Sequence, residues 1–346
     1  MIALDAKEKK LEQVIRLAHG NGGKLTQELI RGILLPRFNN SFLAPLNDSA
    51  VFEVGDTKIA FTTDSYVIKP IFFPGGDIGK LSVSGTVNDL TVMGAKPLFI
   101  SCSLIIEEGF PLSTLKKIVS SIEDTAEKAE VKVVTGDTKV VEKGSGDEIF
   151  INTSGIGIVS PEIEHLSSDR IEIGDLIVIN GTVGDHSIAV LSQREELGCG
   201  GSVVSDCAPL YGLLEEIRLY WRYIKFMRDP TRGGIAGVLN EIVQGKKFGI
   251  KLWEKKIPLK EETLAFCELL GMDPLYHAND GKIVFFVKRE KADEIVSALC
   301  GHSLGEKASI IGEVVADPPG KVYLETIIGT KRVVDMLVED QLPRIC

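Results

Sequence analysis

Ile78-Gly-Lys-Leu-Ser-Val-Ser-Gly-Thr-Val-Asn-Asp-Leu-Thr-Val-Met93 is the stretch that decides the fold. Its apolar residues recur at helical spacing, which predicts a helix over residues 78–93. We expect strands on either side of it at residues 51–54, 58–63, 98–106, 131–141 and 148–158, and a second amphipathic helix at 112–129. Strands interleaved with helices indicate a mixed α/β (α+β) domain.

A polar segment at residues 161–174 marks the boundary to a second half, in which the alternation of strands and helices restarts. We expect helices there at residues 186–193, about 209–225, 234–245, 261–270 and 291–299, and strands at 176–180, 283–287, 310–315 and 322–327. Near the N-terminus, helices are predicted at residues 7–18 and 26–35, the second ending before Pro36. At 346 residues the chain exceeds the usual size of a single core, so we expect domains at 1–160 and 161–335 and a flexible tail at 336–346.

Composition and charge limit the partners and the location of the chain. The formal net charge is −10, whereas binding to nucleic acid or to an anionic membrane needs a basic face, so we expect neither partner. No run reaches 18 consecutive apolar residues, and residues 1–10 lack the apolar region of a signal peptide, so we expect a cytoplasmic protein. The six cysteines contain no Cys-x-x-Cys pair and are too sparse for a disulfide framework.

Five aspartates stand beside turns or strand ends, and all but the fourth are candidates for a cation site: Asp48, Asp64, Asp89, Asp137 and Asp229. The ordinary interpretation of each is a helix cap or a residue that shapes a turn. Asp89 is harder to explain in this way because it lies within the apolar helical pattern, where an unpaired carboxylate is costly. Carboxylate oxygens from separate loops suit Mg²⁺ bridging nucleotide phosphates, and no histidine or cysteine cluster in the sequence has zinc or iron–sulfur spacing.

Two glycine-rich stretches, Gly20-Asn-Gly-Gly-Lys24 and Gly75-Gly-Asp-Ile-Gly-Lys80, could supply backbone amides to phosphate groups. Neither is a Walker A loop, since the second lacks the four-residue gap between glycines and has Leu81 in place of the required hydroxyl. Lys24 is either a clamp that closes over a nucleotide or a solvated surface lysine.

The chain ends Gln341-Leu-Pro-Arg-Ile-Cys346, with a thiol on the last residue. No following chain restrains this thiol, so it can enter a narrow cleft or a partner's pocket. The segment from Leu337 to Cys346 could span roughly 33 to 36 Å when extended, which is enough to move between two sites. The alternative is a frayed terminus that carries an incidental cysteine.

Motifs spread along nearly the whole chain resemble those of one protein family. They include His19-Gly-Asn-Gly-Gly-Lys24, Gly85-Thr-Val-Asn-Asp-Leu90, Val134-Thr-Gly-Asp-Thr-Lys-Val140, Gly184-Asp-His186, Arg228-Asp-Pro-Thr-Arg-Gly-Gly234 and the ending Pro343-Arg-Ile-Cys346. They resemble the HypE hydrogenase maturation factors, carbamoyl dehydratases in the superfamily of aminoimidazole ribonucleotide synthetase and selenophosphate synthetase. The resemblance implies an ATP-using enzyme with two α/β domains that forms a homodimer through its N-terminal strands.

The same resemblance implies a reaction and its protein partners. A carbamoyltransferase, HypF, is expected to load Cys346 with an S-carbamoyl group, and the chain is expected to use ATP to dehydrate this group to a thiocyanate. The cyano group is then expected to pass to iron on a complex of HypC and HypD, on the way to the nickel–iron hydrogenase centre.

Residue roles are implied by the matching motifs. Asp48, Asp64, Asp89 and Asp229 are expected to bind Mg²⁺ and the nucleotide, with Gly22, Gly23 and Lys24 over the phosphates and Gly136, Asp137 and Lys139 nearby. Lys139 and Asp280 are candidates for the base that removes the amide proton. At Asn279-Asp280-Gly281 the family is expected to have Asn-Glu-Gly, so this side chain is one methylene shorter, and the alternative role for Asp280 is an Asp-Gly turn.

Two other functions are compatible with these patterns. One is an ATP-dependent synthetase that acts on a free small molecule, with the tail incidental. The other is a non-catalytic carrier or docking protein whose tail only presents a carbamoyl or cyano group.

Overall fold

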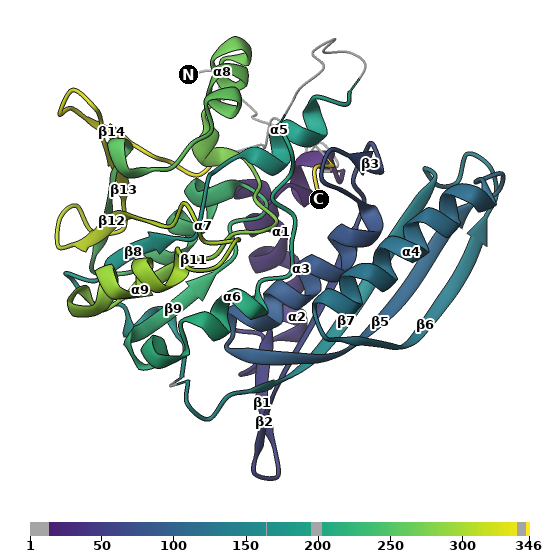
Figure 1. Cartoon of the computed structure of the whole chain (residues 1–346), viewed down its shortest axis with the longest axis horizontal. Helices are drawn as coiled ribbons and strands as arrows, with labels where there is room; N and C mark the ends of the chain where they lie inside the picture. Colours follow the sequence, from purple (N-terminus) through teal and green to yellow (C-terminus); the bar gives the residue numbers. More distant parts are fainter. Residues whose placement is uncertain (1–13, 164, 195–202, 338–343) are drawn as a thin grey trace, which may run out of the picture.

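The computed structural model describes residues 14–163, 165–194, 203–337 and 344–346. In this part of the chain, two large β-sheets, each covered by helices, form two mixed α/β halves that lie side by side (Figure 1). None of the described helices is both long and apolar enough to cross a membrane.

The N-terminal half supplies the smaller of these sheets and the helices that cover it. Its elements are η1 (Leu17–Gly20), α1 (Lys24–Leu29), η2 (Ile30–Leu34), α2 (Leu35–Phe38), β1 (Ala50–Val54), β2 (Thr57–Tyr66), β3 (Phe72–Phe73), β4 (Gly76–Asp77), α3 (Ile78–Val92), β5 (Ala95–Glu107), α4 (Leu112–Lys128), β6 (Lys132–Val141) and β7 (Ile149–Val159).

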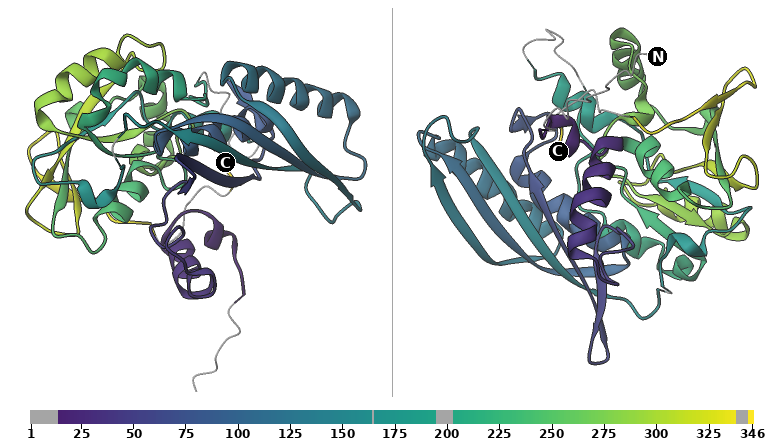
Figure 2. Two further views of the ribbon diagram at one scale, coloured as in Figure 1. Left: turned by 90° about the horizontal axis from the view of Figure 1, so that it is seen from below. Right: turned by 180° about the vertical axis from the view of Figure 1, so that it is seen from behind.

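The sheet of this half has the strand order β1-β2-β7-β5-β6 in the described chain, and only β5 and β6 pair in parallel. Helices α3 and α4 lie against one face, and Figure 2 shows α4 on that side of the sheet. Alternate residues of β7, such as Ile149, Ile151 and Thr153, are therefore buried beneath helices. On the opposite face, called here the open face, Phe61 and Ile156 remain exposed.

The C-terminal half contains the larger sheet. Its elements are η3 (Ser168–Arg170), β8 (Leu176–Ile179), α5 (Asp185–Leu191), α6 (Tyr211–Glu216), η5 (Arg218–Tyr223), β9 (Ile224–Arg228), α7 (Gly234–Val243), β10 (Gly249–Trp253), η6 (Glu254–Lys256), α8 (Glu261–Leu270), η7 (Pro274–Tyr276), β11 (Val284–Val287), η8 (Arg289–Lys291), α9 (Ala292–Leu299), β12 (Ser309–Val315), β13 (Val322–Glu325) and β14 (Lys331–Val333).

The larger sheet has the order β14-β13-β10-β12-β8-β11-β9 and is packed on both faces. Phe226 and Phe286 join the core that contains the apolar side of α7, whereas Met227 and Phe285 join the core that contains α6 and α9. Neighbouring residues of β9 and β11 thus point into different cores, which is why these strands have continuous apolar sequences.

Helix α3 lies between the two halves and is buried on almost every side. Asp77 caps its first turn by accepting hydrogen bonds from the backbone N–H groups of Gly79 and Lys80. Close packing on β2 requires Gly85, because a Cβ there would lie 2.4 Å from the hydroxyl oxygen of Tyr66. Asn88 donates a hydrogen bond to the Ala208 carbonyl, so α3 is fixed to the C-terminal half as well.

The structure confirms the predicted strands of the first sheet and the helices α3, α4, α7, α8 and α9, with small shifts at their ends. The single helix predicted at about 209–225 is wrong, because α6 and η5 are followed at Ile224 by strand β9. Hydrophobic periodicity cannot distinguish a strand buried on both faces from a buried helix segment. Strands β10 and β14 were not predicted.

The N-terminal helices also differ from the prediction. The helix expected to end before Pro36 continues through the π-helical turn η2 into α2, and Pro36 lies near the start of α2, directly after that turn. The helix expected at residues 7–18 falls largely on residues outside the described ones, and Leu17–Gly20 forms a short 3-10 turn.

Candidate active site

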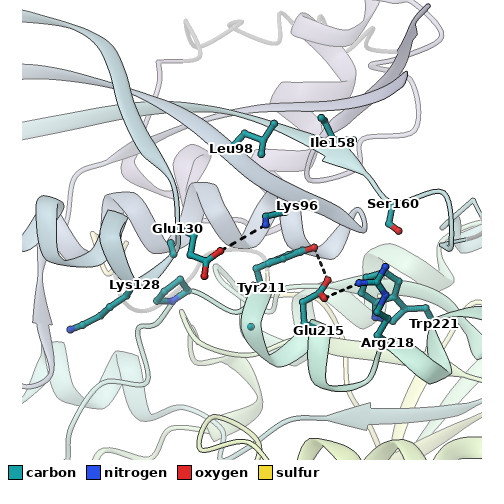
Figure 3. Close-up of a pocket in the computed structure, with 13 residues that line it drawn as sticks. Lys96, Leu98, Lys128, Glu130, Ile158, Ser160, Tyr211, Glu215, Arg218 and Trp221 are labelled. Atoms are coloured by element: carbon teal, nitrogen blue, oxygen red, sulfur yellow. Dashed lines mark hydrogen bonds and ion pairs between the residues drawn. The ribbon is translucent and has the colours of Figure 1, made fainter. Parts of the chain in front are cut away.

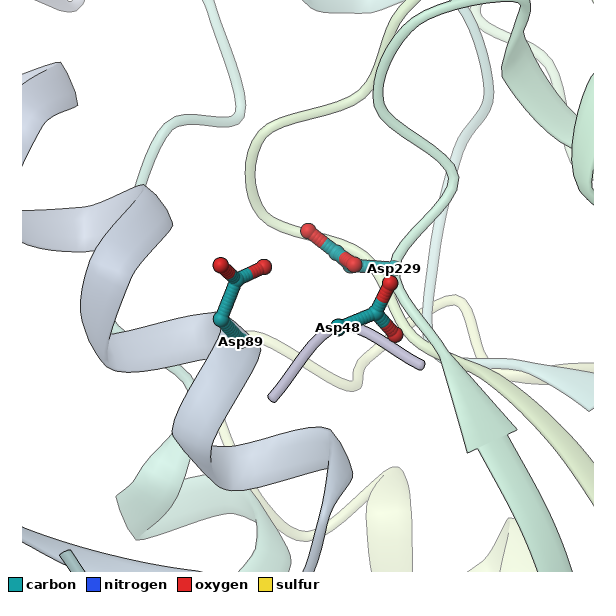
Figure 4. A group of neighbouring side chains, drawn as sticks. All are labelled: Asp48, Asp89 and Asp229. Carbon is teal, nitrogen blue, oxygen red and sulfur yellow. The ribbon is translucent and has the colours of Figure 1, made fainter. Parts of the chain in front are cut away.

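Three aspartates from distant parts of the chain meet where the two halves adjoin. Asp48 precedes β1, Asp89 lies on α3, and Asp229 follows β9. One carboxylate oxygen from each lies within 4.8 Å of the other two, and Figure 4 shows the three side chains converging. Carboxylate oxygens at this spacing are suitable ligands for one small divalent cation.

The electrostatics of the cluster also favour a cation. Burial raises the pKa of Asp48 to about 6, against the lowering effect of Arg228, whose Nε lies 2.9 Å from Asp48 Oδ1. Burial, followed by repulsion from the neighbouring carboxylates, raises the pKa values of Asp89 and Asp229 well above the usual range. Asp48 Oδ2 is buried and makes no hydrogen bond in the described structure. A bound Mg²⁺ would relieve both the repulsion and the unpaired oxygen, so the residues present fit this ion.

Asp89 is held in place by a neighbouring strand. Thr62 on β2 donates a hydrogen bond of 2.7 Å from Oγ1 to Asp89 Oδ2. Asp64, two residues further along β2, lies beside the cluster, and burial raises its pKa as well.

The aspartates line a cavity of about 250 Å³ that also includes Asp64, Asp280, Arg232 and Cys346 in its wall. A larger space of about 730 Å³ adjoins it, shares Arg228 and Arg232 with it, and is bordered by Phe42 and Phe52. Together the two spaces provide a highly charged end beside the aspartates and an aromatic end away from them. Their size is in the range of cavities that hold cofactors and small ligands.

The end of the chain is anchored next to this cavity through Arg344. The Arg344 guanidinium pairs with Asp147, and its Nε donates a hydrogen bond of 2.8 Å to the Val67 carbonyl. The Arg344 carbonyl accepts a hydrogen bond of 3.1 Å from the backbone N–H of Lys69. Residues 338–343 of the predicted tail lie outside the described residues.

The last two residues continue from this anchor, and Cys346 reaches the wall of the cavity. Ile345 is buried in the core that α3, α4 and α5 share, and its carbonyl oxygen lies 2.8 Å from Nε2 of His186. The sulfur of Cys346 lies 4.0 Å from Nη1 of Arg232. The structure therefore brings Cys346 together with Asp48, Asp89 and Asp229 within one chain.

Asp280 belongs to a buried chain of charged groups. Its Oδ2 lies 2.7 Å from Nε2 of His186, and its backbone N–H donates to Asp206 Oδ1 at 3.3 Å. Asp206 in turn accepts a hydrogen bond of 2.9 Å from Lys282 Nζ. Burial opposes a charge on His186, but Asp280 and then Asp206 raise its pKa above the usual value. The backbone of Asp280 is thus fixed while its carboxylate forms part of the cavity wall.

The glycine loop at residues 20–24 reaches the cavity through Gly22, whose φ is +78°. A Cβ on Gly22 would lie 2.7 Å from Cβ of Arg232, so only glycine allows this approach. Gly23 is buried as the N-cap of α1. The ammonium group of Lys24 is exposed and lies 4.0 Å from Glu28, so the structure does not bring it to the aspartates.

Gly136, Asp137 and Lys139 lie on β6, the edge strand of the first sheet. The Lys139 ammonium lies 2.7 Å from Asp137 Oδ1, and both side chains are more than half exposed. A hydrogen bond from Lys139 lowers the pKa of Asp137. Lys139 pairs with Ile105 in the register, which places it on the open face, and none of the three residues lines the cavity in one chain.

Sequence reasoning did not assign roles to Arg232, His186 or Thr62. Arg232 and His186 stand inside two of the motifs quoted above, but nothing in the sequence indicates that either lies beside the terminal cysteine. Thr62 lies in an ordinary alternating strand, and its hydrogen bond to Asp89 depends on how α3 packs on β2.

A separate cavity of about 630 Å³ lies between the start of β5 and helix α6 (Figure 3). Four of its charged side chains form pairs, Lys96 with Glu130 at 3.8 Å and Arg218 with Glu215 at 3.4 Å. Tyr211 donates a hydrogen bond of 2.6 Å to Glu215. With these groups satisfied by each other, the cavity lacks the concentration of one charge that distinguishes the aspartate site.

Two protein families match the chain, one on each half. The family described as AIR synthase related protein, N-terminal domain, matches residues 46–159, and AIR synthase related protein, C-terminal domain, matches residues 172–325. A relative named carbamoyl dehydratase HypE from Bradyrhizobium diazoefficiens is 46% identical over 99% of this chain and 100% of the relative. The carbamoyl dehydratase HypE of Escherichia coli is 45% identical over 96% of this chain and 99% of its own length.

Solved structures show the same similarity. A crystal structure of a HypE–HypF complex matches with a TM-score of 0.84 and 48% identity, covering 89% of this chain and 99% of the other. A HypE structure in complex with ATP matches with a TM-score of 0.80 and 42% identity, covering 96% of this chain and 100% of the other. Thiamine monophosphate kinase from Aquifex aeolicus, 19% identical over 89% of this chain and 99% of its own, shares the fold with a TM-score of 0.64. These matches confirm the predicted two-domain fold of the aminoimidazole ribonucleotide synthetase type.

Proposed function

The chain belongs to the HypE family of carbamoyl dehydratases, ATP-dependent enzymes of hydrogenase maturation, and on this premise we propose that its substrate is carried on its own tail. In this proposal an S-carbamoyl group on Cys346 is dehydrated to a thiocyanate, which supplies the cyanide ligand of the iron in nickel–iron hydrogenase. The reaction takes place in the cytoplasm.

One observation carries the proposal. Cys346 lines the same cavity of about 250 Å³ as Asp48, Asp89 and Asp229. A group attached to this sulfur is therefore held beside the site best suited to a nucleotide phosphate and its cation. Proximity of this kind converts an encounter between two molecules into a step within one molecule.

The two adjoining spaces divide naturally between the parts of ATP, the ligand that a HypE relative contains in its crystal structure. We place the phosphates at the aspartates, covered by the Gly22–Gly23 backbone, and the adenosine toward Phe42 and Phe52. Asp48, Asp89 and Asp229, with Asp64 beside them, would hold Mg²⁺. When bound, this ion neutralises phosphate charge and orients the phosphoryl group for transfer. Lys24 closes over the phosphates from its exposed position at the start of α1.

The chemistry makes a poor leaving group into a good one. The carbamoyl oxygen attacks the γ-phosphorus of ATP, so that an O–P bond forms and the bond to ADP breaks. The nitrogen then loses both of its protons, the C–O bond breaks, and phosphate departs as the C≡N bond forms. Each step needs a positive environment for the phosphoryl group and a base near the nitrogen.

Asp280 is our first candidate for that base. Its Oδ2 is buried and makes no hydrogen bond in the described structure, so a proton acceptor stands in the cavity wall. The carboxylate is one methylene shorter than that of glutamate, and the backbone hydrogen bond to Asp206 sets its depth in the wall. Lys139 is the second candidate, with Gly136 and Asp137 beside it.

Lys139 could reach a cavity only across an interface, and the open face suggests one. Phe61, Ile156 and Phe99 are adjacent in the register there and are 42%, 39% and 44% exposed. An apolar row on a sheet face favours cover by another protein surface. We propose a homodimer through this face, which carries Lys139 toward the cavity of the partner subunit.

The tail also explains how the enzyme obtains its substrate. A HypE relative is found in a complex with HypF, and we propose that HypF loads Cys346 in this chain too. A complex of HypC and HypD then accepts the cyano group. We retain the division into domains at residues 1–160 and 161–335 and a tail at 336–346.

The two alternatives account for less of the structure. A synthetase for a free small molecule would have its cavity narrowed by Cys346. A carrier that only presents a group would have no use for three closely spaced aspartates whose mutual repulsion costs stability.

The test is mass spectrometry of the C-terminal peptide. The chain is first incubated with HypF, carbamoyl phosphate and ATP, and the mass of the carbamoylated peptide is recorded. After removal of HypF and nucleotide, addition of fresh ATP and Mg²⁺ is expected to convert the carbamoylated peptide to the peptide lighter by one water, with one ATP consumed per thiocyanate. ATP consumption without this mass change would favour the small-molecule synthetase, and a mass change without ATP would refute the dehydratase.

A further inference from the structure

His186 lies at the point where the docked tail meets the candidate base. Its side chain is fully buried on α5, and the ring of Phe73 packs edge-on with centroids 5.3 Å apart. Nε2 lies 2.8 Å from the Ile345 carbonyl oxygen and 2.7 Å from Oδ2 of Asp280. One ring nitrogen thus faces two acceptors, one from the tail and one from the catalytic cavity.

The position of the proton follows from the chemistry of these neighbours. A carbonyl oxygen can only accept a hydrogen bond, so Nε2 carries a hydrogen. The other ring nitrogen, Nδ1, lies 2.8 Å from Oγ of Ser205, which also accepts from the backbone N–H of Cys207 at 3.0 Å. The single Nε2–H points to Ile345, because Asp280 Oδ2 makes no hydrogen bond in the described structure.

We propose that His186 is a positioning residue that exposes the Asp280 carboxylate only when the tail is docked. With the tail out, Nε2–H donates to Asp280 Oδ2 and occupies it. With the tail in, the Ile345 carbonyl takes this hydrogen bond, and Oδ2, although 2.7 Å from Nε2, is left without a hydrogen-bond donor beside the group on Cys346. The inference rests on the proposed function, in which Asp280 removes the amide proton.

The surroundings restrict the exchange to this one hydrogen bond. The Asp280 backbone is held by Asp206 at its N–H, and its carbonyl accepts a hydrogen bond of 3.2 Å from Asn88 on α3. Oδ2 therefore cannot easily move away to find another donor. A buried oxygen without a hydrogen bond costs free energy, and the contacts of the docked tail keep Asp280 Oδ2 in this state.

In this proposal, Asp280 and the tail compete for one hydrogen-bond donor, Nε2–H of His186. Asp280 must therefore weaken docking of the tail by the same factor by which the docked tail weakens the hydrogen bond between His186 and Asp280. Trypsin offers a measure of tail docking that involves no carbamoyl chemistry, since cleavage after Arg344 requires the docked segment to leave its contacts. Loss of the Ile-Cys dipeptide from the full chain is followed by intact-protein mass spectrometry.

The expected results form a double-mutant cycle. His186→Phe should accelerate dipeptide loss about tenfold, the effect of losing one hydrogen bond to a buried acceptor. Asp280→Ala should slow it about threefold or more, because the competitor is gone. In the His186→Phe background, Asp280→Ala should change the rate much less. His186→Gln, whose amide can still donate to the carbonyl, should stay within about threefold of wild type.

Asp147→Asn is the matched control for tail loosening. It removes the ion pair with Arg344 and should accelerate dipeptide loss, but it leaves His186 and Asp280 in contact, so Asp280→Ala should slow cleavage in this background as in wild type. Circular dichroism and melting temperature verify that each variant is folded, and His186→Gln replaces His186→Phe in the cycle if the latter is not.

Two results would overturn the proposal: cleavage of Asp280→Ala at or above the wild-type rate, or an equal effect of Asp280→Ala with and without His186. The role of Asp280 as the base is tested by a separate experiment. Thiocyanate formation at the wild-type rate by carbamoylated Asp280→Ala would remove Asp280 from the chemistry whatever proteolysis shows.

Discussion

At the residue scale, the environment of Cys346 separates it from the other cysteines of the described chain. Cys207 and Cys267 are buried, and burial raises the pKa of both thiols, that of Cys267 to about 11. Cys346 instead lies beside the Arg232 guanidinium in a polar cavity. Its position favours chemistry on the sulfur, whereas Cys207 and Cys267 have positions typical of structural thiols.

Cys346→Ala, or removal of the last residue, is therefore expected to abolish thiocyanate formation. The melting temperature should stay within about 2 °C of wild type, because Arg344 and Ile345 supply the anchoring contacts. Magnesium-dependent ATP binding should also persist. Cys300→Ala, which removes an exposed thiol, is the control and should retain full activity. Thiocyanate from the truncated chain would refute the central proposal.

The aspartate cluster leads to a second prediction at this scale. A carboxyl whose pKa is raised on folding binds its proton more tightly in the folded chain. The free energy of unfolding therefore falls as the pH rises from the pKa of the unfolded chain, near 4, through the raised pKa of the folded chain. Asp89→Asn removes this loss of stability. Without divalent ions, the melting temperature of the variant should therefore exceed that of wild type by about 2 to 4 °C at pH 7.5, and the two melting temperatures should converge near pH 4.

The same variant should lose function. At limiting Mg²⁺ its ATP turnover should fall by roughly a hundredfold, and added Mg²⁺ should stabilise the wild type far more than the variant. Asp56→Asn, in the exposed turn between β1 and β2, is the control and should change neither property. An unchanged turnover for Asp89→Asn at limiting Mg²⁺ would show that Asp89 has only a structural role.

At the scale of elements, the packing of α3 on β2 decides where Asp89 points. Gly85→Ala places a Cβ 2.4 Å from the Tyr66 hydroxyl, so either the helix or the tyrosine must shift. Destabilisation of about 1 to 3 kcal/mol is expected, measurable by chemical denaturation, together with weaker ATP binding. Gly32→Ala, in η2 with no atom within 4 Å of the added Cβ, should be neutral or slightly stabilising. Equal stability of the two variants would contradict the close packing.

This scale also shows what the sequence could and could not predict. Strands such as β2 and β7 alternate buried and exposed residues, and α4 has one apolar face, so local periodicity was enough for them. Strand β9 has no such period, because Phe226 and Met227 enter opposite cores. Asp89 could be singled out as a carboxylate in an apolar helix. Its partnership with Thr62, and that of His186 with Ile345, depends on contacts between distant segments, which one sequence does not encode in any local pattern.

At the scale of the whole molecule, the open face of the first sheet leads to the prediction about assembly. Wild type is expected to sediment as a dimer at micromolar concentration. Phe99→Asp places a charge at the β5 end of the apolar row and should weaken association by roughly a hundredfold. Leu112→Asp, at the exposed start of α4, is the control and should leave the dimer intact. A wild-type chain that sediments only as a monomer would exclude this interface.

The burial of α3 on almost every side has a consequence for how such proteins change over time. Val92 packs into the core of the C-terminal half, and Asn88 holds the backbone at Ala208 and Asp280, so each half completes the surface of the other. The two halves are therefore not interchangeable modules. A chimaera of two relatives can be joined at residues 160–171, by recombination or by design. It should have a working catalytic centre only where both relatives have the same residues on the surface of α3 that contacts the C-terminal half.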